Sequence, residues 1–144
     1  MKDFGKLLDT TPLDNGLELR FYDQSRPVAG DRWLVQLLID LPISVDESIL
    51  RGLPASDPPF GDFLDRFGPT VHYQVTKTRH FVPQEDAKAI LAHLRNEFLA
   101  AGIGYLNHPD FPRRYFLKVY KEWAEKEKFR RAHLKAIQEA DTKR

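Results

Sequence analysis

The residues whose types and spacing best suit binding chemistry lie between positions 23 and 32, in a polar segment that joins two predicted strands. Two arginines there carry planar guanidinium groups, which bind phosphate or carboxylate through paired hydrogen bonds. Two aspartates lie within a few residues of them, and their carboxylates can instead pair with the arginines or cap turns of the loop. The sequence favours this structural interpretation, and a small-anion or nucleotide site is the alternative. The candidate ligand-binding residues are Arg26, Arg32, Asp23 and Asp31.

A second group of candidates lies in the C-terminal segment, where positive charge and aromatic side chains occur together. Residues 113–144 contain 11 Lys and Arg against 5 Asp and Glu, a net charge of +6, whereas residues 1–112 carry a net charge of −5. Basic and aromatic side chains suit a nucleic acid. However, the interleaved acidic residues would repel its backbone, which argues against that partner.

The C-terminal segment therefore has three interpretations, which we rank in order. The first is a terminal helix kept in solution by mixed charge, the second is docking on a protein partner or self-association, and the third is weak nucleic-acid binding. The candidate partner-binding residues are Tyr120, Trp123, Phe129, Arg130 and Arg131.

The sequence lacks the common catalytic and metal-binding patterns. It contains no cysteine, which excludes disulfides, thiolate metal sites and cysteine nucleophiles. The five histidines have no metal-ligand spacing. His72 and His80, on one face of a predicted strand, would lie about 26 Å apart at ~3.3 Å per residue. No glycine-rich phosphate loop, GxSxG or HExxH motif is present. We therefore predict a non-enzymatic protein with no metal site and no cofactor.

Hydrophobic alternation between residues 4 and 43 predicts three antiparallel strands. Residues 17–23 alternate apolar and polar side chains, as expected for a strand with one buried face. The Asn-Gly pair at 15–16 suits a tight hairpin turn, which pairs this strand with a first strand over residues 4–13. Residues 33–43 contain the most apolar run and predict a central strand covered on both faces. Trp33 is expected to be buried near the centre of the sheet.

The middle of the chain predicts a short helix, a fourth strand and a longer helix. Four apolar residues recur at helical spacing in the 57–67 region, which predicts the short helix. Residues 70–82 alternate again and form the strand. The longer helix opens at Pro83, whose ring suits a first helical turn, and is expected to end near Gly102.

A last helix is predicted from Arg113. Its apolar stripe fails after Ala124, and side chains of opposite charge four residues apart continue the helical pattern. A helix without tertiary packing is marginal, so its end is expected to fray in solvent. Residues 1–128 are thus predicted to form a single domain, and residues 129–144 a charged helical or frayed tail.

Together these elements predict an α+β fold with a four-stranded, mainly antiparallel meander sheet. The short helix in the 57–67 region and two C-terminal helices complete it, the last ending in a charged, solvent-exposed tail. No apolar run approaches the ~18 residues of a membrane span, and the first residues lack the apolar core of a secretory signal. A soluble, cytoplasmic protein without a membrane partner is expected.

The function favoured by these patterns is that of a small non-enzymatic interaction or regulatory domain. Its partner would be another protein or a second copy, bound through the C-terminal helix. A small-anion or nucleotide site in the 23–32 loop is the first alternative, and weak nucleic-acid binding through the basic helix is the second.

Overall fold

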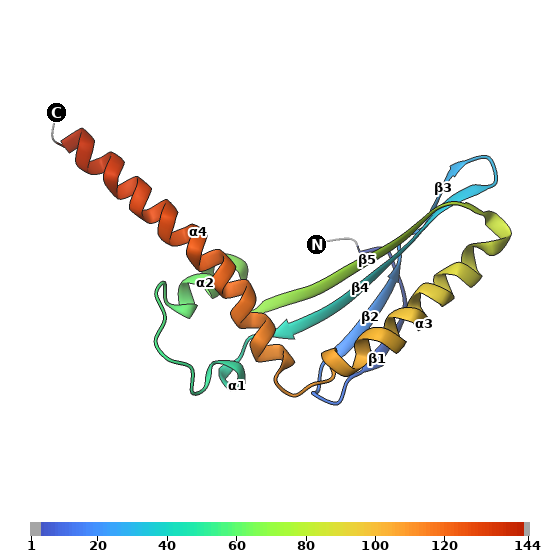
Figure 1. The fold of residues 1–144 in the computed structure, drawn as a ribbon, viewed down its shortest axis with the longest axis horizontal. Helices are drawn as coiled ribbons and strands as arrows, with labels where there is room; N and C mark the ends of the chain where they lie inside the picture. Colours follow the sequence, from blue (N-terminus) through green and yellow to red (C-terminus); the bar gives the residue numbers. More distant parts are fainter. Residues whose placement is uncertain (1–3, 143–144) are drawn as a thin grey trace. The chain divides into compact units, whose positions relative to one another are not determined.

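The computed structural model describes residues 4–142 and confirms the α+β class. In chain order its elements are β1 (Lys6–Pro12), β2 (Glu18–Asp23), β3 (Arg26–Ala29), β4 (Arg32–Ser44), α1 (Glu47–Leu50), α2 (Phe60–Phe67), β5 (Thr70–Pro83), a 3₁₀ turn (Gln84–Asp86), α3 (Ala87–Leu106) and α4 (Phe111–Thr142) (Figure 1). The described residues form two compact units. Unit 1 contains residues 4–43 and 72–111, and unit 2 contains residues 44–71 and 112–142. Each unit buries side chains of its own.

Two antiparallel hairpins build most of the sheet. The first joins β1 to β2, so the predicted hairpin is confirmed, but its turn covers residues 14–16. The Gly16 N–H donates to the Leu13 carbonyl at 3.1 Å, and Gly16 has a positive φ angle of 86° whereas Asn15 does not, so the two-residue turn expected at 15–16 is not formed. In the second hairpin, β2 and then β3 pair with β4 in one continuous register, from Arg20 opposite Asp40 to Pro27 opposite Trp33. Proline is tolerated in β3 because the strand ends the β1-β2-β4-β3 order, and an edge strand can spare an N–H donor.

The last strand, β5, is a further neighbour of β4. His72 contacts Asp40, and Thr78 contacts Gln36. Residue numbers increase along β5 while those of the contacted residues of β4 decrease, so the two strands are antiparallel. The meander is therefore confirmed, but the sheet has five strands instead of the four expected, since β3 forms within the predicted loop.

The core of unit 1 lies between the sheet and α3, which runs along one face of the strands (Figure 1). The Phe21 ring of β2 meets the Phe98 ring of α3 edge-on, with centroids 6.4 Å apart. Leu91 and Leu94 of α3 are buried as well. Alternate positions of β2 and β4 supply much of the rest of this core, namely Leu19, Val35, Leu37, Ile39, Leu41 and Ile43. Burial of each such side chain contributes about 1.5–3 kcal/mol.

Unit 2 is held together by aromatic rings on α2 and α4. Phe63 of α2 is buried, and its ring contacts those of Phe116, Tyr120 and Trp123 at centroid distances of 5.7, 6.3 and 5.6 Å. These three residues lie on successive turns of α4. The rings meet at steep angles, an arrangement that their quadrupoles favour. The predicted short helix is therefore confirmed as α2, and α4 is its packing partner.

Arg113, in the first turn of α4, joins that helix to α1. Its guanidinium donates to the carbonyl oxygens of Ser48 at 2.9 Å, Ile49 at 3.0 Å and Arg51 at 3.1 Å. Carbonyls at a helix end lack intrahelical donors, so these bonds satisfy them. At the other end of α1, the Asp46 carboxylate accepts from the backbone N–H groups of Ser48 and Ile49. A hydrogen bond from the Ser48 hydroxyl is the main cause that lowers the pKa of Asp46.

The structure corrects three further details of the predicted elements. The 23–32 segment is mostly hairpin, and only residues 30–31 remain as its tip. Trp33 is half-buried, not buried near the sheet centre, because it lies beside that tip. Helix α3 passes Gly102 and ends at Leu106. Helix α4 continues to Thr142, the helical one of the two forms predicted for the tail, and its fraying in solvent stays a prediction.

Candidate functional site

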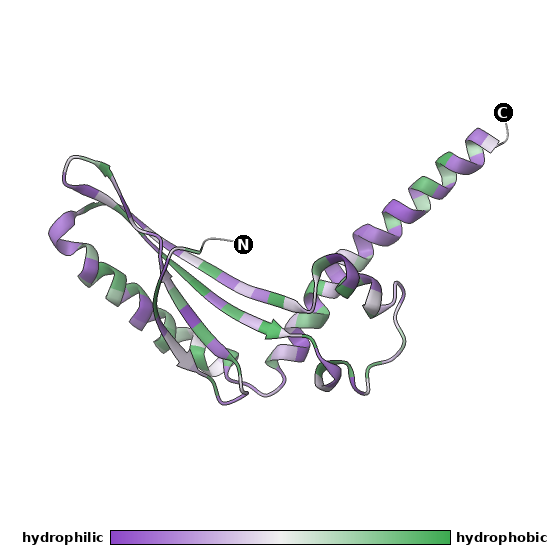
Figure 2. Ribbon diagram, turned by 180° about the vertical axis from the view of Figure 1, so that it is seen from behind, coloured by the Kyte–Doolittle hydropathy of each residue, from purple (hydrophilic) through white to green (hydrophobic). Residues whose placement is uncertain are grey.

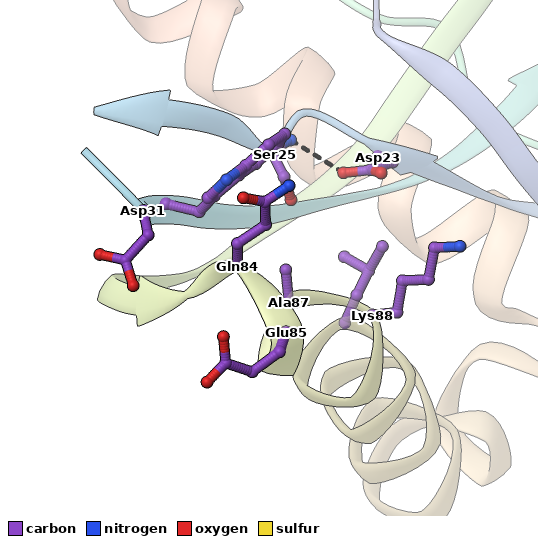
Figure 3. Close-up of a pocket in the computed structure, with 9 residues that line it drawn as sticks. Asp23, Ser25, Asp31, Gln84, Glu85, Ala87 and Lys88 are labelled. Atoms are coloured by element: carbon purple, nitrogen blue, oxygen red, sulfur yellow. Dashed lines mark hydrogen bonds between the residues drawn. The ribbon is translucent and has the colours of Figure 1, made fainter. Parts of the chain in front are cut away.

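The hairpin tip and the start of α3 form a pocket in unit 1, which we call the hairpin pocket (Figure 3). Its volume is about 630 Å³, within the range of ~300–1,000 Å³ that is usual for small-molecule sites. The lining residues are Asp23, Ser25, Asp31, Trp33, Gln84, Glu85, Ala87, Lys88 and Leu91. Two of the four candidate ligand-binding residues, both aspartates, are therefore in one pocket.

Hydrogen bonds fix the walls of the hairpin pocket. The Asp23 carboxylate accepts from the backbone N–H of Ser25 at 2.8 Å, which forms a turn between β2 and β3. The Ser25 hydroxyl in turn accepts from the backbone N–H of Gln36 at 3.1 Å. On the opposite wall, the backbone N–H of Gln84 donates to the Asp31 carbonyl at 2.9 Å. The hairpin tip is thereby joined to the turn that precedes α3.

The side chains of the pocket combine an apolar surface with negative charge. The half-buried indole of Trp33 is the largest apolar group in the lining. Asp31 and Glu85 lie toward one end of the pocket, and Asp23 and Lys88 lie toward the other (Figure 3). Three carboxylates against a single ammonium group make the lining favourable to a cation.

The two candidate arginines lie outside the hairpin pocket. Arg26 lines a separate hollow of about 300 Å³ together with Gly5, Gln24, Leu34 and Gln36. The Arg32 guanidinium lies 3.9 Å from the Asp31 carboxylate, a long ion pair between exposed groups. Asp23 caps a turn, as the structural interpretation of the loop predicts. The pockets found among the described residues do not place the two guanidinium groups together, as an anion site would require.

The partner-binding candidates on α4 fall into two environments. Tyr120 is 6% exposed, and its hydroxyl donates to the Pro58 carbonyl. Trp123 is half-buried against Phe63. Tyr120 and much of Trp123 therefore belong to the core of unit 2 and are not free surface. Phe129, in contrast, is 76% exposed.

The two candidate arginines of α4 are bound to Glu127. The Glu127 carboxylate accepts from Arg130 at 2.5 Å and from Arg131 at 2.9 Å, and Arg131 also donates to Asp62 of α2 at 3.2 Å. The hydrogen bond from Arg130, followed by that from Arg131, lowers the pKa of Glu127 from 4.5 to about 2. This network marks the end of the packed part of α4, because residues 132–142 are all exposed.

Asp40 is a buried carboxylate that sequence reasoning missed. It is 0% exposed on β4, and its Oδ1 atom lies 2.9 Å from Nδ1 of His72 and accepts from the Gln74 side chain at 3.1 Å. Its Oδ2 atom is buried and has no hydrogen-bond partner among the described residues. The pair orients a histidine ring and ties β5 to β4. The sequence did contain one signal for this site, because Asp40 is the single acidic residue within the most apolar run of the chain.

Residues 4–142 contain no group of three or more His, Asp or Glu side chains arranged to hold a metal ion. In the same part of the chain, no helix has the length and apolar character needed to span a membrane. The cytoplasmic location remains a prediction. Comparisons with protein-family models, curated proteins and solved structures give no match. Function is therefore inferred from the chain's own residues.

Proposed function

We propose that the protein is a non-enzymatic binding module whose hairpin pocket takes a small organic cation with an apolar body. The observation that carries this proposal is the combination of the Trp33 indole with three carboxylates in one pocket of about 630 Å³. The face of an indole attracts cations through its quadrupole. Carboxylates accept strong hydrogen bonds from ammonium and guanidinium groups. Binding there would make the module regulatory, since the ligand would stabilise the hairpin tip against α3.

Asp31 and Glu85 are the acids best placed to receive the charged end of the ligand. Both side chains are exposed, so a ligand can reach them. They approach from two elements, the hairpin tip and the turn before α3, which the hydrogen bond from Gln84 to Asp31 holds together. Asp23 is less available, because its carboxylate already accepts from Ser25.

The same lining disfavours an anionic ligand in this pocket, so the sign of the ligand's charge distinguishes the two classes of ligand. An anion would meet three carboxylates and one ammonium group in the lining, and the only further cation described beside these acids is the Arg32 guanidinium, 3.9 Å from the Asp31 carboxylate. Arg26 and Arg32, on which the anion alternative depends, do not line the pocket. The charge of the ligand is therefore the property to test.

A matched pair of probes separates charge from shape. Phenylethylammonium and phenylacetate share an apolar body and differ in the sign of their charge. We expect phenylethylammonium to shift the NMR signal of the Trp33 indole N–H in a saturable titration, and phenylacetate to leave it unchanged. Equal shifts with both probes would overturn the preference for a cation, and no shift with either would overturn the pocket.

Variants assign the effect to particular carboxylates. The double substitution Asp31→Asn with Glu85→Gln is expected to weaken phenylethylammonium binding about 10-fold or more, the equivalent of ~1.4 kcal/mol. Asp86→Asn is the matched control, because Asp86 adjoins Glu85 in the same 3₁₀ turn but does not line the pocket. N-acetylarginine amide, tested beside the free amines, distinguishes a basic side chain of a protein from a small metabolite as the source of the cation.

A second candidate function is docking of a protein partner through α4. The observation that favours it is the group of large apolar side chains left exposed beyond Glu127, namely Phe129, Leu134 and Ile137. Hydrophobic segments continue among hydrophilic ones along this part of α4 in Figure 2. An isolated helix without tertiary packing is marginal in water, so a partner that covers these side chains would stabilise it.

Photo-crosslinking tests this second function directly. A photoreactive amino acid in place of Leu134 is expected to give a discrete protein adduct in cells, whereas the same group in place of Lys121, an exposed site nearer the start of α4, is not. Equal labelling at the two positions, or no adduct at Leu134, would contradict docking through the exposed part of the helix.

A further inference from the structure

The face of α4 that packs in unit 2 continues beyond the packed region. Phe116, Tyr120 and Trp123 are spaced by four and then three residues, and they contact α2. The same alternation of four and three residues leads to Glu127, Arg130, Leu134, Ile137 and Asp141. Residues at this spacing form one seam along a helix, as in a coiled coil. We call these last five residues the distal seam.

The distal seam has little cover within unit 2. Only Glu127, at its start, is shielded, with a side chain 12% exposed between Arg130 and Arg131. Leu134 is 42% exposed and Ile137 is 45% exposed, although both are large aliphatic residues. Arg130 and Asp141 are exposed on either side of them. The seam thus places an apolar pair between Arg130, whose exposed guanidinium also binds Glu127, and the anionic side chain of Asp141.

This order of side chains is self-complementary in one orientation. If two seams run antiparallel about a twofold axis between positions 135 and 136, Leu134 lies opposite Ile137 of the second copy, and Arg130 lies opposite Asp141. A parallel pair would instead set Arg130 against Arg130 and Asp141 against Asp141. Like charges in contact are destabilising, so the antiparallel arrangement is favoured.

We propose that the distal seam of α4 binds the same seam of a second copy in antiparallel orientation. The proposal rests on the second candidate function and names its partner. A twofold interface of this kind uses one surface patch on both subunits.

The size of the contact sets the expected strength. The seam from Glu127 to Asp141 spans about 21 Å at ~1.5 Å per residue. Two helices in contact over this length bury less than the ~1,200–2,000 Å² of a standard stable interface. We therefore expect a concentration-dependent equilibrium between monomer and dimer in the micromolar range, and not a permanent dimer.

Sedimentation equilibrium with charge variants tests the proposal. Arg130→Glu and Asp141→Lys, each alone, are expected to raise the dimer dissociation constant about 10-fold, and the double variant is expected to recover most of that loss. Lys128→Glu is the matched control, because it makes the same charge change as Arg130→Glu but lies off the seam. Failure of the double variant to recover would overturn the pairing of these two residues.

Further variants distinguish association through the distal seam from nonspecific hydrophobic association. Phe129 is the most exposed large apolar residue of α4, but it lies off the seam. Leu134→Asn combined with Ile137→Asn is expected to abolish dimerisation, and Phe129→Ala to leave it unchanged. Circular dichroism checks that α4 remains helical in each variant. Loss of the dimer in Phe129→Ala would overturn the seam.

Orientation is tested with single cysteines, since the chain has none of its own. A mixture of Arg130→Cys and Asp141→Cys proteins is expected to form the mixed disulfide in preference to either homodimer. Preferential homodimer crosslinks would overturn the antiparallel arrangement. A photo-crosslinked adduct at Leu134 whose mass differs from twice that of the chain, without self-association, would support partner docking but overturn the second copy as the partner.

Discussion

The two units bury their cores by different means. Unit 1 places apolar side chains, aliphatic except for Phe21, at alternate positions of β2 and β4, and α3 covers that face. Unit 2 has no sheet of its own among its described residues and depends on a few large rings that α2 and α4 bring together from distant parts of the chain. A regular aliphatic core spreads its stabilisation over many residues, whereas an aromatic cluster concentrates it in a few.

The units also differ in where they place charge. Unit 1 buries the Asp40 carboxylate completely and leaves one of its oxygens without a partner among the described residues. Unit 2 keeps its acids at helix ends and in surface networks, as with Asp46 and Glu127. A buried carboxyl group favours the register of β4 and β5 that brings it to His72 and Gln74. The surface network instead ends the packing of α4 and leaves the distal seam open.

The largest effect is expected from a substitution that breaks the aromatic cluster of unit 2. Phe116→Ala removes a fully buried ring and is expected to lower the free energy of unfolding by ~3–5 kcal/mol. Phe129→Ala on the same helix is the matched control, because that ring is exposed, and its effect is expected to stay within ~0.5 kcal/mol. Urea denaturation measures both. Comparable losses would show that Phe129 is covered in solution.

Next in size is the link between α1 and α4. Arg113→Ala leaves three carbonyl oxygens of the α1 region without their charged donor, and we expect a loss of ~1.5–3 kcal/mol. Arg113→Lys keeps the charge but not the planar group with several donors, so it should recover only part of this loss. Full recovery with lysine would show that charge, and not hydrogen-bond geometry, holds the two helices together.

The buried acid of unit 1 provides a further comparison. Asp40→Asn is expected to cost ~1–3 kcal/mol, because the amide would place donors where the unpaired Oδ2 atom has no partner. Glu18→Gln, an exposed acid on β2, is the control and should change stability little. An unchanged melting temperature in Asp40→Asn would indicate that a water molecule reaches the buried oxygen.

A smaller effect is expected at Phe81, near the end of β5. This residue has a φ angle of 55° and an exposed ring, so it adopts a left-handed conformation without a buried contact in return. Phe81→Gly is expected to raise stability by up to ~1 kcal/mol, because glycine adopts this conformation without strain. Phe81→Ala removes the ring and keeps the strain, so thermal unfolding should separate the two causes. A loss of stability in both variants would mean that the ring makes a contact.

The smallest expected effect is the response of the Glu127 network to pH. Its folded-state pKa of about 2 lies below the ordinary 4.5. A lowered pKa means that the ionised form contributes stability above pH 4.5, and that this contribution is lost as pH falls toward 2. The difference in stability between the wild type and Glu127→Gln should therefore shrink over this range. A difference that is constant with pH would contradict the lowered pKa.

Local patterns sufficed to predict most elements of this fold. The alternation in residues 17–23 and 33–43, the Asn-Gly turn and the helical spacing in 57–67 each describe a single segment, and all four correspond to observed elements. Such patterns report which face of one element is buried. They could not show that β3 would continue the register of β2, because the choice between loop and strand depended on pairing with β4.

The candidate sites depended on contacts between distant residues, and so only folding could assemble them. The hairpin pocket joins Asp31 and Trp33 to Glu85, more than fifty positions later in the chain. Likewise, Asp40 contacts His72 only because β4 pairs with β5. The sequence predicted that the apolar stripe of α4 fails after Ala124. The exposure of Leu134 and Ile137 followed from where α2 ends its contacts, at the hydrogen bond between Asp62 and Arg131. Residue types are set by the chain, whereas neighbours across the fold are set by register and packing, which no single segment encodes.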